Sequence, residues 1–126
     1  MEMTTNAVAW FEIPATDFER AKRFYSAIFD FDMPEMPMGP NRMGFLPHEQ
    51  GKGVGGAILS GEGQAPAKTG TVVYLAGGKD LSVVLGRVEK AGGKVVVPKT
   101  DIGGGMGFWA HFLDSEGNKV GLHSMG

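Results

Sequence analysis

The first part of the chain shows a change in the spacing of its apolar residues on either side of Pro14. The run from Trp10 to Ile13 is rich in aromatic and β-branched residues, which predicts a short strand ended by the proline. Behind it, apolar side chains recur at steps of three and four, which predicts an amphipathic helix. These positions are Phe18, Ala21, Phe24, Tyr25 and Ile28. Thr16 and Glu19 have the spacing of a capping box, so Thr16 is expected to cap this helix.

The same order of elements returns in the second half of the chain. An apolar run from Thr71 to Ala76 leads through a Gly-Gly turn into a second series at helical spacing. That series consists of Leu81, Val84, Leu85, Val88 and Ala91. Gly92 and Gly93 follow it and suit a left-handed helix stop. A repeat over about half of a chain indicates a duplication rather than a solenoid.

Each half also contains further apolar runs bounded by turn residues. They predict strands at Phe31–Met38, Met43–Leu46 and Val54–Ser60, and again at Lys94–Val97, Phe108–Leu113 and Lys119–Ser124. Prolines confine Phe31–Met38 to a sheet edge, and Pro98 is expected to halt the strand before it. The paired glycines of Val54–Ser60 indicate that another group packs very close to the backbone there.

These elements describe an α+β fold made of two tandem βαβββ modules. The first module is expected at about residues 7–60 and the second at about 71–124, within a single domain that covers residues 1–126. The segment from Gly61 to Gly70 has the composition of a linker between them.

Composition and charge exclude several classes of protein. A formal net charge of -2 and a pI near 5.9 provide no basic face for nucleic acid or for an anionic membrane. The chain has no cysteine, so it has no disulfide, thiolate nucleophile or cysteine metal ligand. No apolar run approaches the ~20 residues that span a bilayer, and Met1 to Asn6 lacks a signal pattern. The protein is therefore expected to be cytoplasmic.

The sequence resembles the vicinal oxygen chelate superfamily, which includes glyoxalase I, bleomycin-resistance proteins and extradiol dioxygenases. The likeness lies in the repeated element order, in TDFERAKRFYSAIF, in VEKAGGKVVVP and above all in AHFLDSEGNKVGL, whose turn has the form Asp-x-x-Gly-Asn. It implies that the two modules form a cup-shaped mixed sheet with helices on the outside, that a ligand binds in the cup, and that the chain pairs as a homodimer.

The resemblance also implies where a metal would be held in the enzymes of this superfamily. Those positions carry His, Gln or Glu in the enzymes, and here they fall on Trp10, on Val73 or Tyr74, on Gly121 and on Gly55 or Gly56. None of these side chains suits a divalent metal. No metal or other cofactor is expected, and the alternative is a divalent metal held at an atypical site.

Seven residues are candidates for lining the cup. They are Trp10, Glu12, Tyr74, Phe108, His111, Gly121 and His123. By strand alternation Glu12 shares a face with Trp10, so it points into the cup if Phe11 and Ile13 pack under the helix. Glu12, His111 and His123 are the candidates for acid–base catalysis; each also has a purely structural interpretation, a local hydrogen bond at a strand end.

Two functions remain open from the sequence. The first is a protein that holds a small, partly apolar molecule in the cup without a metal, for which an aromatic lining is suited. The alternative is a lyase, isomerase or dioxygenase that uses an atypical metal site or acid–base chemistry by Glu12 and a histidine. Neither the ligand nor a reaction is identified by the residues.

Overall fold

The computed structural model describes all residues, 1–126, and has two helices and eight strands. In chain order these are β1 (Phe11–Ala15), α1 (Phe18–Phe29), β2 (Glu35–Met38), β3 (Asn41–Phe45), β4 (Gly56–Ser60), β5 (Tyr74–Ala76), α2 (Ser82–Leu85), β6 (Lys94–Asp101), β7 (Phe108–Leu113) and β8 (Lys119–Ser124). The order confirms two tandem βαβββ modules, and residues 61–70 between them contain no strand or helix.

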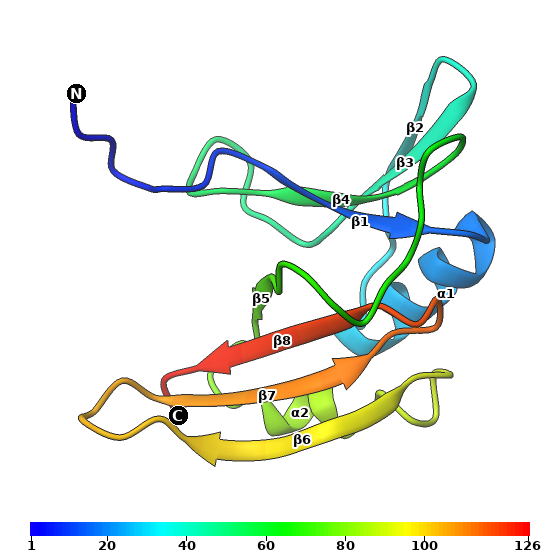
Figure 1. Cartoon of the computed structure of the whole chain (residues 1–126). Helices are drawn as coiled ribbons and strands as arrows, with labels where there is room; N and C mark the ends of the chain where they lie inside the picture. The colour runs from blue at the N-terminus through cyan, green and yellow to red at the C-terminus, as the bar shows by residue number, and fades with distance from the viewer.

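Each module forms its own four-stranded mixed sheet. The strand order is β1-β4-β3-β2 in the first sheet and β5-β8-β7-β6 in the second. In both sheets the first and last strands of the module pair in parallel, and the remaining pairs are antiparallel. Figure 1 shows the first sheet above the second, with α1 at the side where the sheets meet.

The two prolines expected to end strands do not end them. Strand β1 continues through Pro14 to Ala15, and β6 continues through Pro98 to Asp101. Both are edge strands with a single neighbour, so the missing N–H of a proline does not have to break a ladder. In β6 the pairing also shifts register between Val95 and Val97 and between Val97 and Thr100.

One core of 18 buried residues joins the modules. It contains Ile13 and Ile58 of the first sheet, Leu75 and Leu122 of the second, and the whole predicted apolar stripe of α1. Helix α2 is shorter than its sequence pattern suggested, but Leu81, Val84 and Val88 are buried in the same core. The helix-covered faces of the two sheets therefore pack toward each other within one chain.

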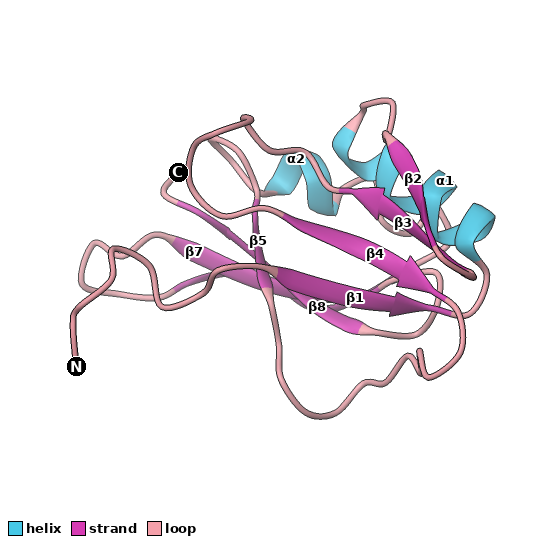
Figure 2. Cartoon of the chain, turned by 90° about the horizontal axis from the view of Figure 1, so that it is seen from above, coloured by secondary structure: helices cyan, strands magenta, loops and turns pink.

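The opposite face of each sheet is not covered by a helix, and we call it the open face. On the first sheet this open face carries Met43, Ala57 and Leu59, which form a separate small cluster with Phe45. On the second it carries Tyr74, Trp109 and His111, since their neighbours Leu75, Ala110 and Phe112 belong to the core. In Figure 2, which looks down on the molecule, both helices lie on the same side. Because the helix-covered faces share the core, the open faces of one chain do not close over each other into a cup.

The turn between β7 and β8 connects the second module to the first. We call residues Asp114–Asn118 the closing turn. Asp114 accepts a hydrogen bond from the Tyr25 hydroxyl of α1 at 2.7 Å, in a buried environment. The Asn118 side chain donates to the Pro14 carbonyl at 2.7 Å and accepts from the Ala67 N–H at 3.1 Å. Burial of Tyr25 and, to a smaller extent, the nearby charge of Asp114 raise the pKa of Tyr25 well above its ordinary value.

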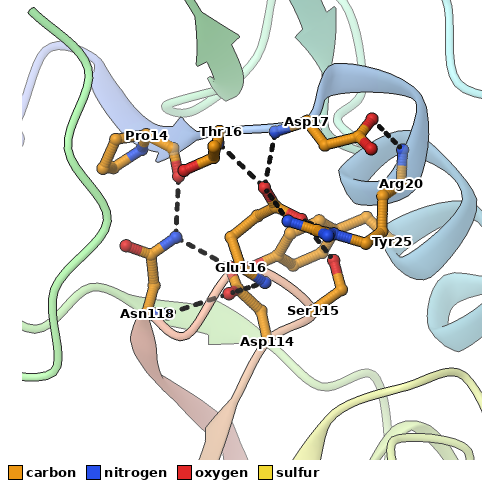
Figure 3. Close-up of polar contacts among 9 residues, drawn as sticks. All are labelled: Pro14, Thr16, Asp17, Arg20, Tyr25, Asp114, Ser115, Glu116 and Asn118. Carbon is orange, nitrogen blue, oxygen red and sulfur yellow. Dashed lines mark hydrogen bonds and ion pairs between the residues drawn. The ribbon is translucent and has the colours of Figure 1, made fainter.

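Glu116 of the closing turn binds the start of α1, and this replaces the predicted capping box (Figure 3). Its carboxylate accepts from the Thr16 N–H at 2.8 Å, from the Asp17 N–H at 2.7 Å and from Arg20 Nε at 2.6 Å. Asp17, not Thr16, is the N-cap, and its side chain accepts from the Arg20 N–H. Glu19 instead pairs with Arg42. The prediction of a Thr16 cap was wrong because Glu116, 100 residues away, supplies the acceptor.

Replacing Glu116 with Gln should destabilise the fold. The Glu116 side chain is 0% exposed, and Gln would place amide donors against the Arg20 guanidinium and the two backbone N–H groups. We expect a loss of about 1.5–3 kcal/mol in the free energy of unfolding at pH 7, measured by urea denaturation. Glu62→Gln, at an exposed position without a side-chain contact, is the matched control. Equal stability of the two variants would contradict the role given to Glu116.

The free energy of unfolding of Glu116→Gln should differ from that of the wild type by an amount that depends on pH. Burial acts to raise the pKa of Glu116, but hydrogen bonds from Arg20, Asp17 and Ser115 outweigh it, so the pKa lies below the ordinary 4.5. The charged form therefore stabilises the folded state fully above about pH 4.5, and this contribution is lost as the pH falls through the lowered pKa. The stability difference between wild type and Glu116→Gln should be constant at neutral pH and shrink below about pH 4.5.

Candidate functional site

A hollow of about 740 Å³ lies beside the first residue of the predicted site, Trp10. It is bounded by the start of β1, by the segment after α1 and by the loop between β3 and β4. We call it the aromatic hollow. Its lining residues are Trp10, Phe31, Asp32, Pro34, Phe45, Leu46, Pro47, His48, Gln50, Gly55 and Gly56. Its size is within the range of pockets that hold small organic molecules.

Trp10 forms one wall of the aromatic hollow and is 43% exposed. Its ring meets Phe45 edge to face, with 6.2 Å between ring centroids, which makes an aromatic corner. Its indole N–H donates to Glu12 Oε2 over 3.4 Å, a long hydrogen bond. Glu12 therefore lies beside Trp10, as the strand alternation predicted, while Phe11 and Ile13 pack against the core.

The paired glycines line the hollow, and the sequence prediction of close packing is confirmed there, because a ring of the chain lies on each of them. A Cβ on Gly55 would lie 3.0 Å from Nδ1 of His48, so the imidazole rests on the backbone of that glycine. A Cβ on Gly56 would collide with the ring of Phe11. His48, Asp32 and Phe31 were not among the predicted site residues, and the only signal for them was the Gly-Gly pair.

A second group of predicted residues lies on the open face of the second sheet. The Tyr74 hydroxyl and His111 Nε2 are 2.7 Å apart, a hydrogen bond whose direction depends on the imidazole tautomer. Trp109 packs edge to face on His111 at 4.8 Å between centroids. Gly121 leaves the space that the Tyr74 ring fills. Burial, and to a smaller extent the positive charge of Lys119, lowers the pKa of His111, which favours the neutral imidazole.

The two remaining predicted residues lie farther along the same sheet. His123 Nε2 is hydrogen bonded to the Met106 carbonyl at 2.8 Å, which ties the loop after β6 to β8. Phe108 packs against the core, and Lys99 lies over its ring at 4.4 Å from the centroid. The structure thus groups Trp10 with Glu12, and Tyr74 with His111 and Gly121, on two different open faces.

Tyr74 also reaches the junction between the sheets. A smaller pocket of about 210 Å³ lies there, bounded by Phe11, Phe29 and Gly56 of the first module and by β5 of the second. It lies next to the aromatic hollow, with which it shares the residues Leu46, Pro47, Gly55 and Gly56. A ligand that occupies the hollow can therefore extend toward Tyr74.

The donor set at the expected metal positions does not fit a divalent metal. The register pairs Tyr74 with Gly121, and Trp10 lies next to Gly55 and Gly56. An indole, a phenol held by His111 and three glycines provide no imidazole or carboxylate ligand at these places. The described residues contain no group of three or more His, Asp or Glu side chains placed to hold a metal ion.

Comparison with known proteins agrees with this architecture. A family model described as Glyoxalase/Bleomycin resistance protein/Dioxygenase superfamily matches residues 7–122. Among curated proteins, no relative matches at a significant level.

The longer helix, α1, has 12 residues, and neither helix is long and apolar enough to cross a membrane.

Several solved structures share the fold. TnmS3, an antibiotic binding protein from Streptomyces sp. CB03234, is 24% identical with a TM-score of 0.69, and the match covers 98% of both chains. A glyoxalase/bleomycin resistance protein from the same organism is 25% identical with a TM-score of 0.68, over 92% of this chain and 98% of that one. A V278E mutant of glyoxalase I from Zea mays is 18% identical with a TM-score of 0.68, over 93% of this chain and 45% of that chain.

Proposed function

Because the chain belongs to the Glyoxalase/Bleomycin resistance protein/Dioxygenase superfamily, we propose that it binds a small, partly apolar molecule without using a metal. The observation that carries this proposal is the aromatic hollow, where the rings of Trp10 and Phe45 form a corner. Rings and prolines around a few polar groups are typical of sites that hold an apolar ligand in one orientation.

The residues at the expected metal positions favour binding over metal-assisted chemistry. Trp10 offers an apolar ring there, the Tyr74 hydroxyl is hydrogen bonded to His111, and Gly121 has no side chain. A related fold also serves as an antibiotic binding protein in Streptomyces. That likeness supports binding as the function of this chain.

The second candidate function is acid–base catalysis in the same superfamily. It is favoured by the 2.7 Å contact between the Tyr74 hydroxyl and His111 Nε2, because a neutral imidazole can take a proton from a bound molecule or relay one to it. Glu12 stands at the edge of the hollow as a further carboxylate. Neither group is held by a third residue in the way that a catalytic triad is, so binding remains the first proposal.

We further propose that the protein acts as a homodimer. The helix-covered faces meet inside one chain, which leaves apolar residues exposed on the open faces, among them Trp10 at 43%, Met36 at 44% and Tyr74 at 49%. Exposed apolar patches of this kind mark association surfaces. A second copy that lays its open face on this one would bury them and complete the cup.

A cytoplasmic location and the lack of nucleic-acid or membrane partners stay predictions.

Replacing Trp10 with Ala should weaken ligand binding far more than it weakens the fold. A thermal-shift screen of small aromatic compounds would supply a ligand, whose affinity is then measured by calorimetry. We expect the affinity to fall about tenfold or more, because an aromatic wall of the hollow is removed. The melting temperature should change little, since Trp10 is 43% exposed. Val83→Ala, at an exposed apolar residue of α2, is the control. Unchanged affinity in Trp10→Ala would count against the hollow as the site.

The homodimer predicts a mass of twice 13.4 kDa in sedimentation equilibrium. Met36→Lys should shift the protein toward the monomer, because a lysine would place a charge on the open face of the first sheet. Val83→Lys adds the same charge on exposed α2 and should leave the dimer intact. A monomeric wild type, or equal dissociation of both variants, would refute the proposed association.

A further inference from the structure

The fixed charge that lines the aromatic hollow is negative. Among its lining residues only Asp32 carries a fixed charge, and no Lys or Arg lines it. Asp32 is exposed and makes no ion pair or side-chain hydrogen bond within the chain. The nearest lysine in the adjoining loop, Lys52, pairs with Glu49 at 3.4 Å. Asp32 is thus a free carboxylate at the edge of an aromatic pocket.

Glu12 adds a second negative charge near the hollow. Glu12 Oε2 lies 3.4 Å from the indole nitrogen of Trp10, so a negative charge stands beside the wall of the hollow as well as on its rim. Asp32 lines the same hollow as the rings of Trp10, Phe31 and Phe45, whose faces attract positive charge. An anionic ligand would meet the charge of Asp32, with that of Glu12 beyond Trp10, and no Lys or Arg among the lining residues.

The shape of the hollow restricts the ligand further. One side is the edge-to-face corner of Trp10 and Phe45, and the imidazole of His48 lies against Gly55. The prolines Pro34 and Pro47 add flat apolar surface. Rings and prolines on several sides accommodate a flat aromatic system better than a branched aliphatic one.

From these observations, and building on the proposed function, we propose that the aromatic hollow binds a small planar aromatic cation. The rings of the ligand would lie against Trp10 and Phe45, and its protonated nitrogen would point toward Asp32. Glu12 would contribute a weaker attraction through its position behind Trp10. The class of ligand is thus a protonated heteroaromatic amine rather than a neutral or acidic aromatic compound.

Three acridines with the same ring system test the charge preference. At pH 7.5, 9-aminoacridine is a cation, acridine is neutral and acridine-9-carboxylate is an anion. Binding to the full-length protein is measured by calorimetry and by the NMR signal of the Trp10 indole N–H, which Trp109→Phe distinguishes from the other tryptophan. The cation should bind about tenfold more tightly than neutral acridine. The anion should bind more weakly than either.

Variants then assign the preference to Asp32. Asp32→Asn should weaken binding of 9-aminoacridine about threefold to fivefold and leave neutral acridine unaffected, because an exposed ion pair contributes modestly. Glu62→Gln removes one negative charge from residues 61–70 and should change neither compound. Equal weakening by both variants would mean that only net charge matters, and it would overturn the role of Asp32.

The outcomes separate this inference from the proposed function. If the three acridines bind equally, with Trp10 perturbed by each, the preference for a cation is wrong and binding of an apolar molecule stands. If none of them binds and the Trp10 signal does not move, both the inference and the assignment of the hollow as the binding site fail. Tighter binding of the anion would overturn the charge argument alone.

Discussion

The fold depends on one buried carboxylate, that of Glu116. It accepts hydrogen bonds from two backbone N–H groups at the start of α1 and pairs with Arg20. In the same turn, Asp114 accepts a hydrogen bond from Tyr25, and Asn118 donates one to the Pro14 carbonyl (Figure 3). These contacts attach the last hairpin of the second module to the strand–helix junction of the first. They fix the helix-covered faces toward each other. The open faces, on which Trp10 is 43% and Tyr74 is 49% exposed, therefore point away from the shared core.

Much of this fold could be predicted because its signals are local. The apolar stripe of α1, the Asp-x-x-Gly-Asn turn and the duplicated element order all lie within short windows of sequence. The errors concern relations between distant residues. The acceptor for the Thr16 N–H is 100 residues away, and only the sheet order reveals that Pro14 and Pro98 lie in edge strands. The direction in which the two open faces point was likewise outside the reach of local patterns.

The candidate site was predicted in part for the same reason. Strand alternation placed Glu12 on the face of Trp10, whereas Trp10 and Tyr74 came from the resemblance to the superfamily. The structure puts these residues on the open faces. The aromatic hollow is different, since Phe31, Asp32 and His48 come from two loops with no periodic pattern. Only the glycines at 55 and 56 indicated that something would pack there. At the positions where the resemblance to the superfamily implies metal ligands, this chain has Trp10, Tyr74 and glycines, which provide no imidazole or carboxylate.

We propose that the superfamily fold functions here without a metal. Elemental mass spectrometry of untagged protein, purified without chelator, tests this proposal most directly, together with a thermal-shift titration of nickel, zinc, manganese and iron(II) on the same sample. We expect no stoichiometric metal and no shift of the melting temperature with any of the four ions. One tightly held metal ion per chain, with a matching rise in melting temperature, would contradict the proposal.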